Sequence, residues 1–93
     1  MHLRQILAST CRQKILETLA RVEQTHMMEL VRKTNSTHSQ INRNLGILVE
    51  ENIVTVKHYG RIKVIQLNRE SEKTQALLKA LNILTRIDQT SKN

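Results

Sequence analysis

Three polar residues in the segment 37–51, THSQINRNLGILVEE, have side chains suited to hydrogen bonding with nucleic-acid bases. Ser39, Asn42 and Arg43 are spaced so that one face of a helix carries all three. An Arg guanidinium pairs with O6 and N7 of guanine, and an Asn amide pairs with N6 and N7 of adenine. The same face is compatible with an ordinary solvated helix surface, so its interpretation depends on the rest of the chain.

The opposite side of this segment is apolar, with aliphatic residues at i, i+4 and i+7: Ile41, Leu45 and Leu48. Such spacing is typical of an amphipathic helix packed on a core. Thr37 followed by Gln40 matches a capping box, which predicts a helix start at Thr37. Because helix N-termini attract phosphate, Thr37 and His38 are candidate DNA contacts. Alternatively, Thr37 serves only as the helix cap, and His38 is a half-buried residue at the rim of the helix.

Gly46 lies inside this predicted helix, where a glycine costs about 1 kcal/mol relative to Ala. It either lets a phosphate backbone approach, allows close packing or is simply tolerated.

A β-hairpin is predicted directly after this helix, from β-branched residues at 53–58 and 62–67. The connection is Tyr59-Gly60-Arg61, with Gly60 supplying a positive φ. Alternation predicts an apolar face of Val54, Val56, Ile62 and Val64, and a basic face that includes Lys57 and Lys63. The candidate DNA contacts on or beside the tip are Lys57, Tyr59, Arg61 and Lys63. They can straddle the backbone or enter the minor groove, although edge-strand lysines also discourage aggregation without any ligand.

Helical periodicity also covers residues 3–21, 27–33 and 71–88. Residues 3–8 are either a separate short helix or the start of the next helix, for which Ser9 or Thr10 is the expected cap. Asn35 is expected in the left-handed region as a turn residue. The flanking cations Arg12, Arg32 and Lys33 are further candidates for phosphate contact. Three helices, a hairpin and a final helix give an α+β fold class, followed by a flexible polar tail at 89–93.

The final helix has a wider apolar arc than a small domain needs for its own core. Apolar surface of this kind usually marks a partner site. We therefore expect a two-fold dimer interface formed with the N-terminal segment by Leu3, Ile6, Leu7, Leu77, Leu81, Leu84 and Ile87. The alternative is that the helix only covers the core of its own chain.

Composition narrows the class of partner. Fifteen Lys and Arg residues against eight Asp and Glu give a net charge of +7 in 93 residues, which favours a polyanion. Tyr59 is the only aromatic residue, so base-stacking RNA binders are disfavoured. No apolar run is long enough for a membrane span, and a single Cys11 suits a reducing cytoplasm. The sequence offers no paired carboxylates, no nucleophile–base set and no clustered metal ligands, so we expect neither an enzyme nor a metal or other cofactor.

The order of these elements resembles the winged helix-turn-helix DNA-binding proteins of the ArsR/MarR type, which include small archaeal, bacterial and viral regulators. The run SQINRNLGILVEENIVTVKHYGRIKVIQLN is similar to their recognition helix and wing. Ser9 to Leu16, STCRQKIL, is similar to the start of their first DNA-binding-domain helix. The lack of a cysteine pair in residues 37–51 departs from their thiolate metal sensors.

This resemblance implies a winged-helix DNA-binding domain over residues 1–70 and a dimerisation helix of the same domain at 71–88. The predicted function is sequence-specific binding of double-stranded DNA by a homodimeric transcriptional regulator in the cytoplasm. The helix at 37–51 is expected in the major groove, with the wing on the backbone or in the minor groove. Two alternatives stay open: an architectural DNA binder without sequence preference, and a winged-helix protein-interaction module.

Overall fold

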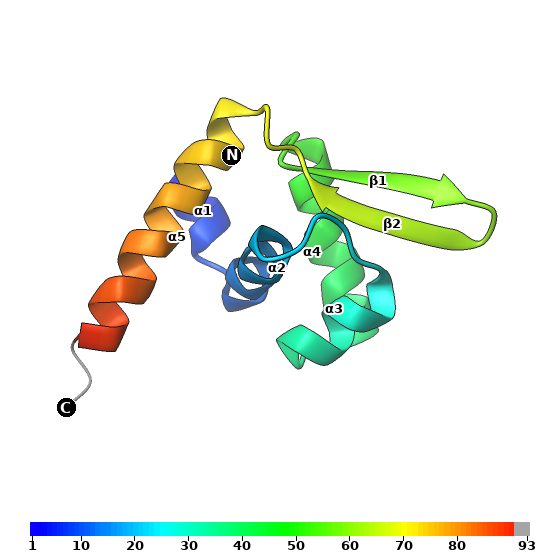
Figure 1. The fold of residues 1–93 in the computed structure, drawn as a ribbon, viewed down its shortest axis with the longest axis horizontal. Coiled ribbons are helices and arrows are strands. Elements are labelled where there is room, and N and C mark those ends of the chain that lie inside the picture. Colours follow the sequence, from blue (N-terminus) through cyan, green and yellow to red (C-terminus); the bar gives the residue numbers. More distant parts are fainter. Residues whose placement is uncertain (91–93) are drawn as a thin grey trace.

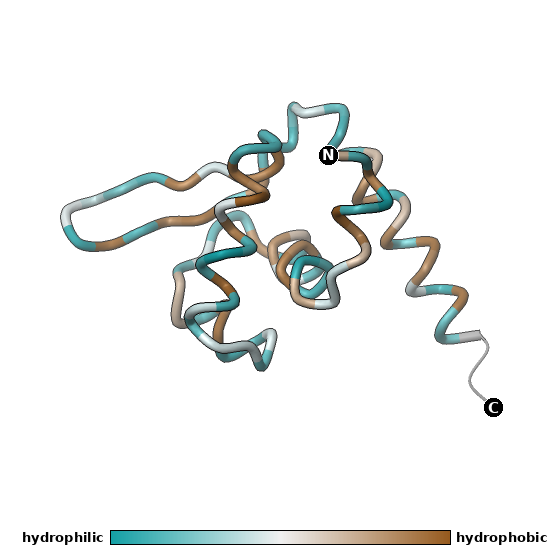
Figure 2. The backbone as a smooth tube through the Cα atoms, turned by 180° about the vertical axis from the view of Figure 1, so that it is seen from behind, coloured by the Kyte–Doolittle hydropathy of each residue, from teal (hydrophilic) through white to brown (hydrophobic). Residues whose placement is uncertain are grey.

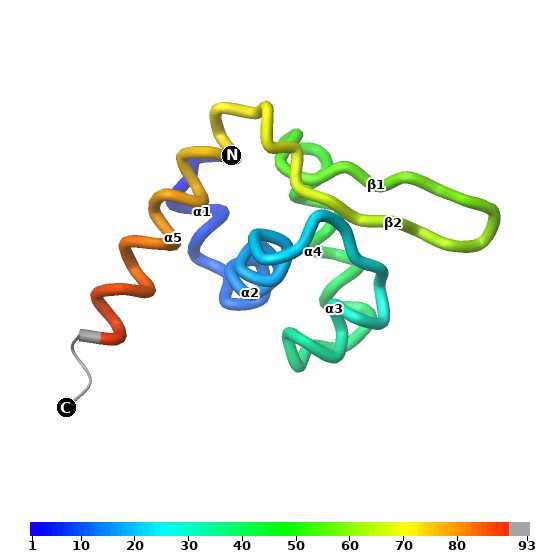
Figure 3. The backbone as a smooth tube through the Cα atoms, viewed as in Figure 1, coloured from blue at the N-terminus to red at the C-terminus, as the bar shows by residue number. Residues whose placement is uncertain are grey.

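The computed structural model describes residues 1–90 and has the predicted α+β class (Figure 1). Its elements are α1 (Leu3–Leu7), α2 (Thr10–Ala20), α3 (Met27–Thr34), α4 (His38–Glu50), β1 (Val54–Tyr59), β2 (Ile62–Leu67) and α5 (Glu72–Thr90). The two strands form one antiparallel sheet. The hairpin projects from one side of α2, α3 and α4, while α5 lies on the other side beside α1 (Figure 3).

Helix boundaries follow local capping chemistry. The chain leaves helical geometry at Ser9, whose hydroxyl accepts a hydrogen bond from the Arg12 backbone N–H at 3.2 Å. This resolves residues 3–21 into two helices, because the Ser9 cap starts a new one. The Thr37–Gln40 capping box is confirmed, with reciprocal hydrogen bonds of 3.1 and 2.9 Å. Asn35 ends α3 with φ 52°, as predicted for a left-handed turn residue.

The core is aliphatic and takes residues from all seven elements and from the loop at Ile53. Its fully or nearly fully buried members are Ile6, Ile15, Leu16, Leu19, Leu30, Ile41, Leu45, Leu48, Ile53, Val54, Ile65, Leu67, Leu77 and Leu81. The predicted buried edge of α4 is therefore confirmed. Figure 2 shows hydrophobic and hydrophilic stretches alternating along α5 and both strands, as expected when one side of each element meets this core.

The predicted faces of the hairpin are wrong for the second strand. Val56 pairs with Ile65 and Lys57 pairs with Val64. Paired residues share a face, so Val64 lies on the same side as Lys57 and not beside Val56. Ile62 pairs with Tyr59 on that outer side and is 61% exposed. The error arose because the turn contains two residues, Gly60 and Arg61, and turn length decides which residues of the second strand face the core.

The set proposed for dimerisation also requires correction. Ile6, Leu77 and Leu81 are 0%, 0% and 5% exposed, because they fill the core of their own chain. Leu7 packs against the same core and is half-buried. Leu3, Leu84 and Ile87 remain exposed, and Ile83 joins them. Helix α5 continues beyond Asp88 to Thr90, and the rest of the expected tail, residues 91–93, lies outside the described residues.

Candidate nucleic-acid interface

Helix α4 presents Ser39, Asn42 and Arg43 to solvent, and we call these three residues the recognition face. The buried stripe of Ile41, Leu45 and Leu48 fixes the rotation of the helix about its axis, so the polar residues must point outward. Within residues 1–90 none of the three side chains of the recognition face forms a hydrogen bond or an ion pair. Their donors and acceptors are therefore available to a ligand.

The hairpin presents the second group of predicted contacts. Lys57, Tyr59, Arg61 and Lys63 are all exposed. Gly60 has φ 63° and Arg61 has a negative φ, which is the pattern of a type II′ turn with Arg61 at the tip. Lys63 lies on the inner side of the hairpin, whereas Lys57 and Tyr59 lie on the outer side.

Helix α4 and the inner side of the hairpin enclose a groove of about 200 Å³ that brings Asn42, Gly46 and Lys63 together. A second hollow brings His38 at the start of α4 near Arg61 and Lys63. Ser39 and Arg43 line neither hollow. Thr37 is exposed, and its side chain serves as the helix cap. Thus the two hollows bring His38 and Asn42 of α4 together with Arg61 and Lys63 of the hairpin. The other predicted contacts are exposed but line neither hollow: Thr37, Ser39, Arg43, Lys57 and Tyr59.

The sequence matches no family model and no curated protein. Solved structures do match. The AntR antimony-specific transcriptional repressor has a TM-score of 0.79 and 18% identity, with 98% of this chain and 78% of that chain covered. A MarR family transcriptional regulator from Silicibacter pomeroyi has a TM-score of 0.72 and 19% identity, over 94% of this chain and 63% of that chain.

A homodimeric winged helix-turn-helix DNA-binding domain from Mycobacterium bovis, described as a possible ArsR-family regulator, has a TM-score of 0.68 and 15% identity over 94% of this chain and 75% of that chain. This chain has a winged helix-turn-helix fold. In that fold α3 and α4 form the helix-turn-helix and the β1–β2 hairpin is the wing, so the predicted architecture is confirmed.

Asn44 is a buried polar residue of the winged helix that the sequence did not single out. It is 4% exposed, and its Oδ1 accepts a hydrogen bond from Arg12 Nη1 at 2.8 Å. Arg12 also donates from Nε to the Ile6 carbonyl at 3.0 Å and from Nη2 to the Gln5 carbonyl at 2.8 Å. The guanidinium thus ties the end of α1 to the middle of α4. These bonds use three of the five N–H donors of the guanidinium and give Arg12 a structural role, while its contact with phosphate stays a prediction.

Two carboxylates hold other cations near the helix-turn-helix. Arg32 Nη2 donates to Glu29 at 2.6 Å, and this hydrogen bond raises the pKa of the Arg32 guanidinium. At the end of α4, Glu51 accepts from Lys73 at 2.6 Å and from the N-terminal ammonium of Met1 at 3.2 Å. These contacts, Lys73 first, hold the pKa of Glu51 below its usual value. They connect the end of α4 to α5.

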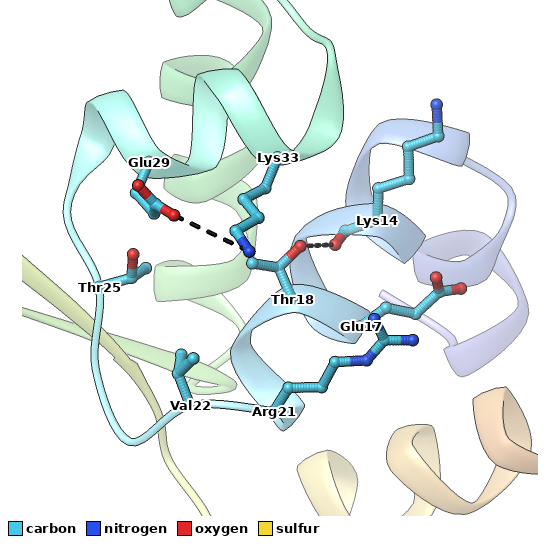
Figure 4. Close-up of a pocket in the computed structure, with 8 residues that line it drawn as sticks. All are labelled: Lys14, Glu17, Thr18, Arg21, Val22, Thr25, Glu29 and Lys33. Atoms are coloured by element: carbon cyan, nitrogen blue, oxygen red, sulfur yellow. Dashed lines mark hydrogen bonds and ion pairs between the residues drawn. The ribbon is translucent and has the colours of Figure 1, made fainter.

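A hollow of about 380 Å³ between α2 and α3 is a less promising site (Figure 4). Lys14, Arg21 and Lys33 line it, but so do Glu17 and Glu29, and Figure 4 shows Lys33 directed at Glu29. Opposite charges therefore offset one another there. Among residues 1–90 no three His, Cys, Asp or Glu side chains gather in a way that holds a metal ion. No helix in the same range is both long and apolar enough to cross a membrane.

Proposed function

We propose that this protein binds double-stranded DNA with sequence preference and acts as a transcriptional regulator. The observation that carries the proposal is the recognition face: three exposed, unpaired polar side chains on α4 of a winged helix, beside a basic wing. Arg43 and Asn42 have the bidentate chemistry that distinguishes bases in the major groove. The net charge of +7 supports attraction to the phosphate backbone. The matched repressor and regulator structures support the same role.

The wing supplies the second part of the proposed interface. Arg61 at its tip is placed to reach the backbone or the adjacent minor groove, where Arg is favoured by the negative potential. Lys57 and Tyr59 extend this contact on the outer side of the wing. Because phosphate contacts carry no sequence information, the wing contributes affinity and the recognition face contributes preference.

We further propose that the protein works as a homodimer. Four apolar side chains on α1 and α5 are 36% to 55% exposed, and exposed apolar surface can mark a partner site: Leu3, Ile83, Leu84 and Ile87. A matched winged-helix domain is described as homodimeric. A two-fold dimer would present two copies of α4 to half-sites roughly 10 base pairs apart. Leu84→Glu should give a monomer in sedimentation experiments, whereas Lys79→Glu, elsewhere on α5, should stay dimeric. A dimer that survives Leu84→Glu contradicts this interface.

The DNA-binding proposal is tested by selection from a random duplex library, followed by a salt titration of the enriched duplex. One enriched motif with two related half-sites is expected. Affinity should fall along a line of log K against log salt, by about 0.9 for each phosphate neutralised. Binding without an enriched motif would instead indicate an architectural protein, and the absence of binding to any duplex would favour a protein-interaction module.

A further inference from the structure

A hollow of about 460 Å³ lies between the wing and the starts of α3 and α4. Residues far apart in the sequence form its lining: His26, Met27, Met28, His38, Arg61, Ile62 and Lys63. His26 is the N-cap of α3, and His38 is the first residue of α4. The hollow lies where the hairpin passes beside α3 and α4, so it belongs to the tertiary structure and not to one motif.

The lining of this hollow is suited to an anion. Arg61 and Lys63 are cationic, His26 and His38 add two imidazoles, and no carboxylate lines the space. Within residues 1–90, the side chains of His38, Arg61 and Lys63 form no hydrogen bond or ion pair. The nearby Glu29 is already engaged by Arg32 and Lys33. The hollow between α2 and α3 differs, because two carboxylates line it.

The other walls of the hollow are apolar. Met28 is 63% exposed, and Met27 lies beside it. Two cations next to an apolar wall match a sugar–phosphate backbone, in which charged phosphates alternate with the weakly polar edges of deoxyribose. A free metal or a neutral ligand would not use this combination.

We infer that this hollow seats one backbone phosphate of bound duplex DNA in each protomer, an inference that rests on the proposed function. Lys63 faces the hollow from the inner side of the wing, and His38 faces it from α4. A phosphate held between them would fix the wing relative to the recognition helix and set how deeply α4 enters the major groove. Lys57 lies on the opposite side of the wing, so of these two lysines only Lys63 lines the hollow.

The decisive experiment scans a bound duplex with single methylphosphonate substitutions, each of which removes the charge of one phosphate. For wild-type protein, one position in each half-site should lower affinity by roughly tenfold, the size expected for a lost hydrogen bond to a charged group. Lys63→Ala should bind the unmodified duplex less tightly by a similar factor and should no longer respond at that position. Lys57→Ala is the matched control: it should weaken binding through the outer side of the wing but keep the full response at that position.

A second measurement uses inorganic phosphate as the probe and requires no DNA. The imidazole NMR signals of His26 and His38 should shift on phosphate addition and saturate, and the shifts should shrink in Lys63→Ala. His2, the N-cap residue of α1, should not respond. If duplex binds but Lys63→Ala keeps the methylphosphonate response, or if phosphate leaves His26 and His38 unmoved, the inference is overturned while the proposed function stands. If no duplex binds, the proposed function and this backbone assignment fail together.

Discussion

Replacement of Arg12 by Ala separates a structural role from a DNA-binding role. From the sequence, Arg12 was a candidate for phosphate contact. In the structure its guanidinium donates to two carbonyls at the end of α1 and to Asn44 of α4, at 2.8 to 3.0 Å. Asn44 in turn donates from Nδ2 to the Gln40 carbonyl at 2.8 Å. We therefore predict that Arg12→Ala destabilises the fold.

The size of the predicted destabilisation depends on which groups lose their hydrogen-bond partner in Arg12→Ala. Asn44 is 4% exposed, so its Oδ1 would lose its partner without gaining water. An orphaned buried acceptor costs about 1–3 kcal/mol. The Gln5 and Ile6 carbonyls can recover hydration in part, so the loss of these two hydrogen bonds should cost about 1 kcal/mol in total. The total is roughly 2–4 kcal/mol, a large share of the roughly 5–15 kcal/mol that stabilises a typical domain. The melting temperature should fall by roughly 10 °C or more.

Urea denaturation of Arg12→Ala, Asn44→Ala and the double variant measures this prediction. Because the two side chains share a hydrogen bond, their effects should couple by about 1 kcal/mol. Arg43→Ala is the matched control: it removes an exposed arginine from α4 and should change stability by less than about 0.5 kcal/mol. The reasoning is refuted if Arg12→Ala is as stable as Arg43→Ala and loses only DNA affinity.

Three further substitutions test single features. Gly46→Ala should stabilise the protein to urea by about 0.5–1 kcal/mol, because an added Cβ meets no atom within 4 Å and Ala favours a helix; reduced duplex affinity would instead identify Gly46 as a point of backbone approach. Thr37→Ala should cost about 1 kcal/mol in the same assay through the lost cap, and an unchanged stability would contradict the cap's importance. Glu51→Gln should lower the melting temperature at neutral pH. The Lys73 contact lowers the pKa of Glu51 in the folded state. The ion pair therefore stabilises the fold fully above the pKa that Glu51 has in the unfolded chain. This stabilisation is lost as pH falls through the pKa of Glu51 in the folded state. The difference from wild type should therefore close in acid, and a difference that persists there would exclude an ionic origin.

Features encoded within a few residues could be predicted from the sequence. The start of α4 was predictable because Thr37 and Gln40 cap each other, and its buried edge because Ile41, Leu45 and Leu48 recur with helical spacing. The exposure of the recognition face then followed from helix geometry.

Features that depend on distant partners could not be predicted in this way. Arg12 and Asn44 are 32 positions apart, and nothing local marks either as part of a buried hydrogen-bond network. The apolar arc of α5 was visible, but only packing decides that Leu77 and Leu81 face the core while Leu84 stays exposed. The hollow beside His38 likewise depends on how the wing packs beside α3 and α4, and its methionines and histidines carry no distinctive spacing.

The most direct test of sequence recognition by α4 compares two duplexes, the enriched site and a scrambled version, by fluorescence anisotropy at one salt concentration. Arg43→Ala should lose about 1–3 kcal/mol of the preference for the enriched site, the usual worth of a bidentate base contact. Arg61→Ala should weaken binding to both duplexes by the same factor. If Arg43→Ala keeps the wild-type ratio of the two affinities, the recognition face does not read the DNA sequence.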